Sequence, residues 1–131
     1  MPIRRATLPT APDDPLRWRE KQFQKHVLAL AADCGWTHRY HTYFSDRSES
    51  GFPDLYMIRP ATGQALIAEL KTMRGRLRPA QEAWFEAFRA HQAAVDLAPR
   101  PKSKTPRPPL FGVYLWRPCC WNSGEIANAL R

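Results

Sequence analysis

Long apolar runs are absent from this 131-residue sequence. It contains no stretch of about 18 consecutive apolar residues, which excludes a membrane-spanning helix of ordinary length. The first 16 residues hold two arginines, two aspartates and four prolines but no apolar segment, so they do not resemble a signal peptide. We therefore expect a cytoplasmic protein.

Cysteine is scarce as well. The sequence has three, Cys34, Cys119 and Cys120, and none belongs to a C-x-x-C pair. An odd number of cysteines without that spacing argues against a disulfide framework and against a zinc site. We expect reduced, buried thiols.

Acidic residues are outnumbered, because 12 Asp and Glu accompany 20 Lys and Arg and give a net charge of +8. Such an excess indicates a polyanionic partner, and nucleic acid is favoured over a membrane because apolar spans are lacking. The length fits one domain that buries its own core. We expect a flexible, proline-rich arm over residues 1–16 and a single domain over residues 17–131.

The first regular element is predicted to be a helix over residues 18–33. Its apolar residues recur at helical spacing; they are Phe23, Val27, Leu30, Ala31 and Cys34. Gly35 suits the C-terminal end of a helix. Glu20 either faces inward with this stripe or is an exposed acid favoured by the helix dipole. Residues 36–44 alternate polar and aromatic side chains, which predicts the first strand.

Residues 51–58 and 65–71 flank a turn at 59–64 and predict a β-hairpin. The first segment contains the carboxylate of Asp54, and the second ends in Glu69-Leu70-Lys71. Because side chains alternate along a strand, Glu69 and Lys71 point to one face and Leu70 to the other. A carboxylate and an ammonium at the end of so apolar a strand are costly to bury unless something nearby uses them.

Residues 72–78 form a basic loop with three arginines around Gly75, a composition suited to contact with phosphates. Pro79 favours the first turn of a following helix. The apolar face of that helix is expected to contain Leu77, Trp84, Phe85 and Phe88. Gln81 is the one amide on this face. It either hydrogen-bonds a neighbouring strand end or helps to order Lys71 and a substrate phosphate.

The C-terminal third begins with a basic, proline-rich insertion at about residues 98–110. Its five prolines and four cations exclude a helix or a central strand, so an extended projection is expected. Residues 93–97, before it, are either a helix tail or a short strand. Residues 111–116 predict the last strand, and residues 123–130 a short closing helix capped by Ser123.

The hairpin carries a family resemblance. Pro53-Asp54, followed fifteen residues later by Glu69-Leu70-Lys71, resembles the PD-(D/E)XK nuclease signature. With Glu20 upstream and Gln81 downstream, the chain resembles the virus-type replication-repair (VRR-NUC) branch, in its stand-alone phage and bacterial form.

This likeness covers about residues 19–90 and resumes at 111–130. It implies an α/β fold of the restriction-endonuclease-like type, a mixed central sheet flanked by helices in the order helix-strand-strand-strand-helix-strand-helix. The insertion at 98–110 departs from the family, which usually joins the helix to the last strand by a short turn. That departure leaves substrate preference and partners open.

The resemblance also implies a metal site for Mg²⁺, with Mn²⁺ as a substitute. The expected metal ligands are Glu20, Asp54, Glu69 and the main-chain carbonyl of Leu70. Two carboxylates 4 Å apart repel by about 4 kcal/mol at an effective dielectric constant near 20, so a divalent cation would stabilise such a cluster.

Roles in catalysis and in DNA contact follow from the same resemblance. The expected catalytic residues are Glu20, Asp54, Glu69, Lys71 and Gln81. Lys71 would orient the attacking water or stabilise the charge of the phosphorane. The expected DNA contacts are Arg47, Arg74, Arg76, Arg78 and His41. For the arginines a solvated surface is the alternative, and for His41 a packing role.

The implied function is a metal-dependent DNA endonuclease, selective for branched DNA like a Holliday-junction resolvase and acting in DNA repair or recombination in a bacterial or phage-infected cytoplasm. Symmetric cutting of two strands would require a homodimer. A flap or nicking nuclease of the same fold is the first alternative. The others are a non-catalytic DNA-binding or scaffold protein and a structural protein that acts through its proline-rich arm. The complete set of acidic residues and lysine argues against a decayed site.

Overall fold

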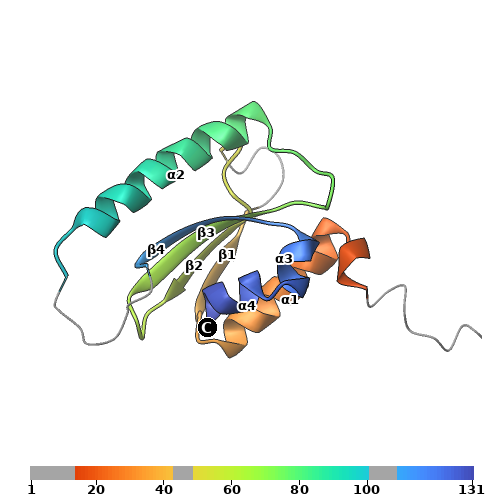
Figure 1. Ribbon diagram of the computed structural model, residues 1–131, viewed down its shortest axis with the longest axis horizontal. Helices are drawn as coiled ribbons and strands as arrows, with labels where there is room; N and C mark the ends of the chain where they lie inside the picture. The colour runs from red at the N-terminus through yellow and green to blue at the C-terminus, as the bar shows by residue number, and fades with distance from the viewer. Residues whose placement is uncertain (1–13, 43–48, 101–108) are drawn as a thin grey trace, which may run out of the picture.

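The computed structural model describes residues 14–42, 49–100 and 109–131. A four-stranded sheet separates one long helix on one face from three helices on the other (Figure 1). In chain order the elements are the 3₁₀ helix η2 (Pro15–Arg17), α1 (Glu20–Asp33), β1 (His38–His41), β2 (Leu55–Arg59), β3 (Gln64–Leu70), α2 (Pro79–Leu97), β4 (Phe111–Trp116), α3 (Pro118–Asn122) and α4 (Glu125–Leu130). The predicted α/β fold with a mixed sheet is confirmed.

Helix α1 buries the predicted stripe, since Phe23, Val27 and Ala31 have no exposed surface. Each large apolar side chain buried in this way stabilises the fold by about 1.5–3 kcal/mol. The helix begins at Glu20, two residues later than predicted, because the backbone of Arg19 is extended. Residues 15–17 form η2, which packs against α3, although residues 15 and 16 were expected to belong to the flexible arm.

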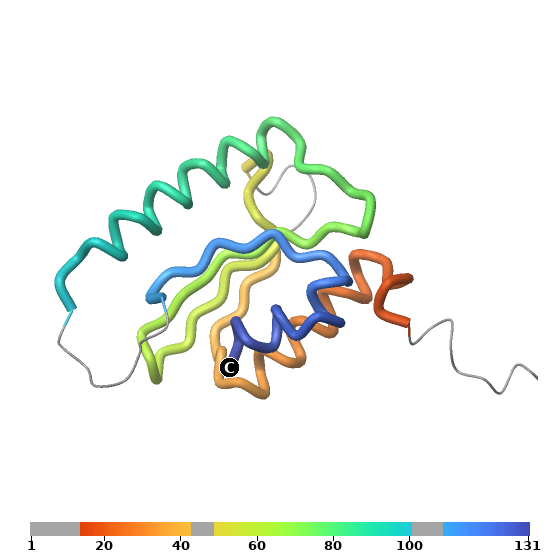
Figure 2. Tube along the Cα trace, viewed as in Figure 1, coloured from red at the N-terminus to blue at the C-terminus, as the bar shows by residue number. Residues whose placement is uncertain are grey.

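Strand β1 is shorter than the predicted 36–44. Trp36 leaves the strand path because its ring is buried and its indole Nε1–H donates to the carbonyl of Leu130 at 2.9 Å. Residues 43 and 44 lie outside the described part of the chain. The sheet order is β1-β2-β3-β4, with β1 and β2 antiparallel to their neighbours and β4 parallel to β3 (Figure 2).

The two faces of β3 divide the core as alternation predicts. Leu66, Ala68 and Leu70 join the cluster that lies under α1 and α4. Ile67 points to the opposite face, where it packs with Phe85 of α2 and with Phe111. Glu69 shares the Ile67 face, so its carboxylate lies on the α2 side of the sheet.

Helix α2 starts at Pro79, as predicted, and residues 93–97 continue it as a helix tail. The C-terminal segment differs from prediction because two helices, α3 and α4, replace the single one expected. Gly124, with φ of +83°, separates them and occupies the N-cap position of α4. Ser123 still contributes, because its hydroxyl accepts a hydrogen bond from the Glu125 backbone N–H at 3.3 Å. Among the described residues, none of the helices has the length and apolarity needed to span a bilayer.

Candidate active site

Asp54 and Glu69 lie side by side where β2 begins and β3 ends. The register pairs Leu55 with Ala68, which places the two acids opposite one another in the next position. The Asp54 backbone N–H donates to Glu69 Oε2 at 3.2 Å. The Leu70 backbone N–H donates to Asp54 Oδ2 at 2.8 Å. Each carboxylate is thus held by the main chain of the neighbouring strand, which fixes the pair without relying on solvent.

Thr42, the residue directly after β1, holds the turn that carries Asp54 by two hydrogen bonds. The Thr42 backbone N–H donates to the Asp54 carbonyl at 2.8 Å, and the Thr42 hydroxyl donates to the Pro53 carbonyl at 2.6 Å. Pro53 itself is fully buried. Thr42 has no place in the motif, and only the pairing of distant strands reveals that it positions the acid.

Glu69 is almost completely buried, with 2% of its surface exposed, and it has two polar side chains beside it. The Lys71 ammonium lies 3.7 Å from Glu69 Oε1. The Gln81 side-chain N–H donates to the same oxygen at 2.9 Å. Lys71 is also buried, at 9% exposure. The lysine and the acid therefore face the same way from the strand, as alternation predicts.

Gln81 connects this strand end to the start of α2. Its Oε1 accepts a hydrogen bond from the Arg78 backbone N–H at 2.8 Å while its Nε2 binds Glu69. Of the two roles left open by the sequence, the structure shows the bond to a strand end. The Gln81 amide thus accepts a hydrogen bond from a backbone N–H at the start of α2, and it also orients the buried Glu69 carboxylate.

Burial raises the pKa of Glu69 to about 8, and the charge and side-chain interaction of Asp54 add to this shift, whereas the hydrogen bond from the Asp54 backbone N–H lowers the pKa. Lys71 opposes the shift but does not overcome it. A buried acid beside a second acid favours the proton or a cation, since either relieves the repulsion. The arrangement therefore has the electrostatics of a cation site.

Glu20, the first residue of α1, faces the same region although its side chain is exposed. Partial desolvation raises the pKa of its carboxyl, the charge of Asp54 raises it further, and Lys71 and Arg78 lower it. These effects place Glu20 within electrostatic range of Asp54 and Lys71. Among the described residues, however, no three Asp, Glu, His or Cys side chains form a close group able to hold a metal ion.

A glycine brings the loop before Asp54 against α2. Gly51 has φ of +84°, and a Cβ there would lie 2.7 Å from the Gln81 backbone nitrogen and closer still to Ala80. The Trp84 indole N–H donates to the Ser50 carbonyl at 3.1 Å. Phe52 packs edge-on against Trp84, with ring centroids 5.1 Å apart. This contact holds the Asp54 loop to the helix that carries Gln81.

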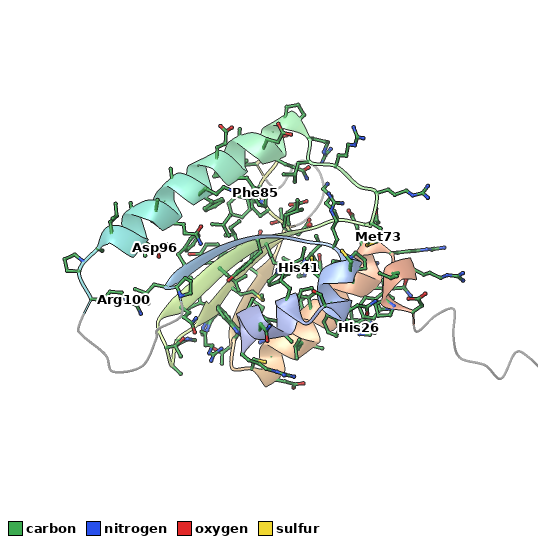
Figure 3. All side chains as sticks on the ribbon, viewed as in Figure 1. His26, His41, Met73, Phe85, Asp96 and Arg100 are labelled. Carbon is green, nitrogen blue, oxygen red and sulfur yellow. The ribbon has the colours of Figure 1, made fainter. Side chains whose placement is uncertain are left out.

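The basic loop leaves β3 directly after Lys71. Arg74, Arg76 and Arg78 are all exposed, as contact with a phosphate backbone requires. Figure 3 shows Met73 on this outer loop, with nitrogen-tipped side chains extending away from it. Arg117, between β4 and α3, restrains the loop, because its Nη1 donates to the Thr72 carbonyl at 2.8 Å and to the Gly75 carbonyl at 2.5 Å. No sequence pattern predicted this role for Arg117.

Of the other two predicted DNA contacts, the structure describes only His41. Arg47 lies outside the described residues, so the structure says nothing about it. His41 is half-buried and pairs with Leu55, a residue of the core cluster beneath α1. By strand register its side chain belongs to the α1 face, opposite Glu69.

The fold and the strand-end cluster of acids, lysine and glutamine define an α/β protein of the restriction-endonuclease-like class. The VRR-NUC domain profile matches residues 9–99, which is more than half of the chain. The chain therefore belongs to the VRR-NUC family, a family of nucleases. No curated protein and no solved structure matches it.

Proposed function

We propose that this protein is a metal-dependent endonuclease that hydrolyses phosphodiester bonds in branched DNA. The observation that carries the proposal is the buried Glu69 carboxylate, held between Asp54, Lys71 and Gln81 at the end of the sheet. A structural core gains nothing from burying two acids side by side. If the two acids bind a cation and then a phosphate, the repulsion between them is relieved and their burial serves the reaction.

The donor set fits Mg²⁺. Carboxylate and carbonyl oxygens are its preferred ligands, and it keeps several waters instead of requiring an all-protein cage. Asp54 and Glu69 would hold the ion, with the Leu70 carbonyl beside them and Glu20 acting through water. When bound, the ion would polarise the phosphate and lower the pKa of a coordinated water.

The chain supplies the remaining requirements. Lys71 places a positive charge beside Glu69, where it can stabilise the charge that develops on the phosphate. Gln81 keeps the Glu69 carboxylate oriented toward the site. The arginines of the loop 72–78 position the DNA backbone without reading its sequence.

Branched DNA is proposed as the substrate because the resemblance is to stand-alone members that resemble junction resolvases. Cutting a four-way junction symmetrically would require two copies of the chain. The excess of basic residues supports a nucleic-acid substrate. The cytoplasm, and repair or recombination of DNA, are the proposed setting.

The direct test is cleavage of labelled four-way, flap, gapped and linear duplex DNA with Mg²⁺ or with EDTA. We expect cleavage of a branched substrate that EDTA abolishes. Asp54→Asn should remove cleavage and leave DNA binding within a few fold, whereas the control Asp96→Asn, on the exposed tail of α2, should cleave normally. Lys71→Ala should lower the single-turnover rate more than Mg²⁺ affinity. Full activity of Asp54→Asn would refute the proposed site.

The loop 72–78 has its own test. Changing Arg74 and Arg76 to Ala should weaken DNA binding and reduce the salt dependence, since each lost phosphate contact lowers the log–log slope by about 0.9. Arg89→Ala is matched in charge but lies on α2, with its guanidinium over the Phe85 ring. An unchanged slope in the Arg74 and Arg76 variant would remove the loop from the DNA path.

A further inference from the structure

On the α2 side of the sheet, β1 and β2 carry exposed apolar side chains. The helix α2 lies over this face of the sheet (Figure 1) and contacts β4. Its Phe85 packs with Ile67 and Phe111 in the cluster beneath it. At the opposite edge, on β1 and β2, Tyr40 is 52% exposed and Ile58 is 37% exposed. Single exposed apolar residues are ordinary, but a contiguous exposed patch marks a binding surface.

Four side chains of β1 and β2 lie on this same face of the sheet. Tyr40 pairs with Tyr56 across the two strands, and His38 pairs with Ile58. Directly opposed side chains on one face of an antiparallel pair have Cβ atoms about 4.5–5.5 Å apart. Together with Arg39 they line a shallow hollow of about 390 Å³. Tyr56 is anchored on its inner side, because it packs against the cluster beneath α2.

This surface adjoins the proposed active site. Continuing the register, Tyr40, Tyr56 and Ile67 form one row across the strands, and the row that contains Asp54 and Glu69 lies two residues further along. Two residues of strand span about 7 Å. Stacked nucleotides rise about 3.4 Å each along one strand, so the distance corresponds to about two nucleotides.

The side chains around the surface indicate which kind of molecule binds there. His38 is on its lining, and none of the acidic residues in the described part of the chain is. Arg39 also borders the hollow, but its pairing with Met57 puts its side chain on the α1 face of the sheet. There its guanidinium donates to the Trp36 carbonyl at 2.6 Å. A second copy pairing along the same edge would bring these basic strands together, which is unfavourable. An aromatic surface whose described lining holds no acid, on a chain with a net charge of +8, suits a nucleobase attached to a phosphate backbone.

We propose that Tyr40 and Tyr56 form a stacking platform for an unpaired base of the DNA substrate, about two nucleotides from the phosphate held near Asp54 and Glu69. The platform rests on the proposed function and refines its substrate class. A paired base is already stacked within its duplex and cannot reach the surface. The platform therefore favours a flap or a splayed branch over a four-way junction with fully paired arms.

The test measures binding in EDTA, where cleavage does not interfere. The probes are a blunt duplex and the same duplex with a single-stranded arm, in which one abasic site is moved along the arm. Tyr40→Ala should weaken binding of the armed DNA about fivefold or more, the effect of losing one base stack. Tyr40→Phe, which keeps the ring, should bind like wild type. The control Leu97→Ala removes a side chain that is 86% exposed at the far end of α2 and should change nothing.

The abasic series separates stacking from general binding. In wild type, one or two abasic positions should weaken binding as much as Tyr40→Ala does, and they should cause no further loss in that variant. The blunt duplex should bind all variants alike. Equal losses on duplex and armed DNA would overturn the platform, as would wild-type affinity of Tyr40→Ala. A change from dimer to monomer in Tyr40→Ala, seen by sedimentation, would instead assign the surface to a second copy and overturn it.

Cleavage with Mg²⁺ tells the two proposals apart. If wild type cleaves branched DNA but shows no base-dependent binding, the platform fails and the nuclease stands. If binding depends on Tyr40 and on the base but no substrate is cleaved, the platform stands and the nuclease fails.

Discussion

Replacing Glu69 by Gln tests whether the strand-end acid exchanges a proton for a cation. Glu69 is buried, lies beside Asp54 and accepts a hydrogen bond from Gln81. Its pKa is raised to about 8, so without a cation it holds a proton at neutral pH. Glutamine has nearly the same shape but does not titrate in this pH range and ligates a cation more weakly.

The direction of the effect follows from the raised pKa. The unfolded chain has the ordinary value of 4.5, so the folded state binds the additional proton. This contribution to stability is complete below about pH 4.5 and is lost as the pH rises through about 8. In EDTA the free energy of unfolding should therefore fall by up to about 1.4 kcal/mol per pH unit across that window. Glu69→Gln should remove this component of the slope.

The proton also competes with Mg²⁺. With a pKa of about 8, roughly 0.9 of a proton should be released on Mg²⁺ binding at pH 7 and roughly 0.1 at pH 9. Below pH 8 the affinity should rise about tenfold per pH unit. Titration calorimetry in two buffers of different ionisation enthalpy measures the number of protons released. The matched control is Glu86→Gln, an exposed acid on α2.

Two results would refute this reasoning. One is Mg²⁺ affinity that does not change between pH 6 and 8 in the wild-type protein. The other is the same proton release from Glu69→Gln as from wild type. Either would mean that the buried acid does not take part in cation binding.

Two further changes test how the site is built. Gly51→Ala should lower the free energy of unfolding by more than the roughly 1–2 kcal/mol that a left-handed alanine costs, because its Cβ would also meet the α2 backbone. The control is Gly63→Ala, which has φ of +76° and open space around it, so it should lower the free energy of unfolding only by the conformational cost. If urea titrations give equal losses of stability for the two variants, the close approach of Gly51 to α2 is contradicted. Arg117→Ala should speed tryptic cleavage within the loop 72–78, because two hydrogen bonds to that loop are lost. Arg59→Ala breaks a similar pair of bonds at the C-terminus and serves as the control; no acceleration in Arg117→Ala would show that Arg117 does not restrain the loop.

Much of the hairpin was predictable because strand alternation and hairpin register depend only on residues close together in the sequence. Strand alternation placed Glu69 on one face and Leu70 on the other before any packing was known. Helical periodicity identified the buried stripe of α1, and a proline marked the start of α2. The spacing of Asp54 and Glu69 across a short turn was enough to bring them together, since a hairpin fixes which residues are opposed.

Element ends were less predictable. A tryptophan suits a helix or a strand, so propensity could not show that Trp18 and Trp36 both leave the regular elements to enter the core. Their positions depend on helices near the end of the chain, as the bond from Trp36 to Leu130 shows. Tertiary burial decides such cases because it outweighs local propensity.

The sequence by itself determined the order of the four strands and of the helices α1 and α2, the face of each strand residue and the residues of the acid–lysine motif, because these depend on near neighbours along the chain. Only the tertiary structure decided that Gln81 binds Glu69, that Gly51 meets α2 and that Arg117 holds the basic loop. Each of these contacts joins segments at least a dozen residues apart. The raised pKa of Glu69 belongs to the same group, since it arises from burial and from a neighbouring strand.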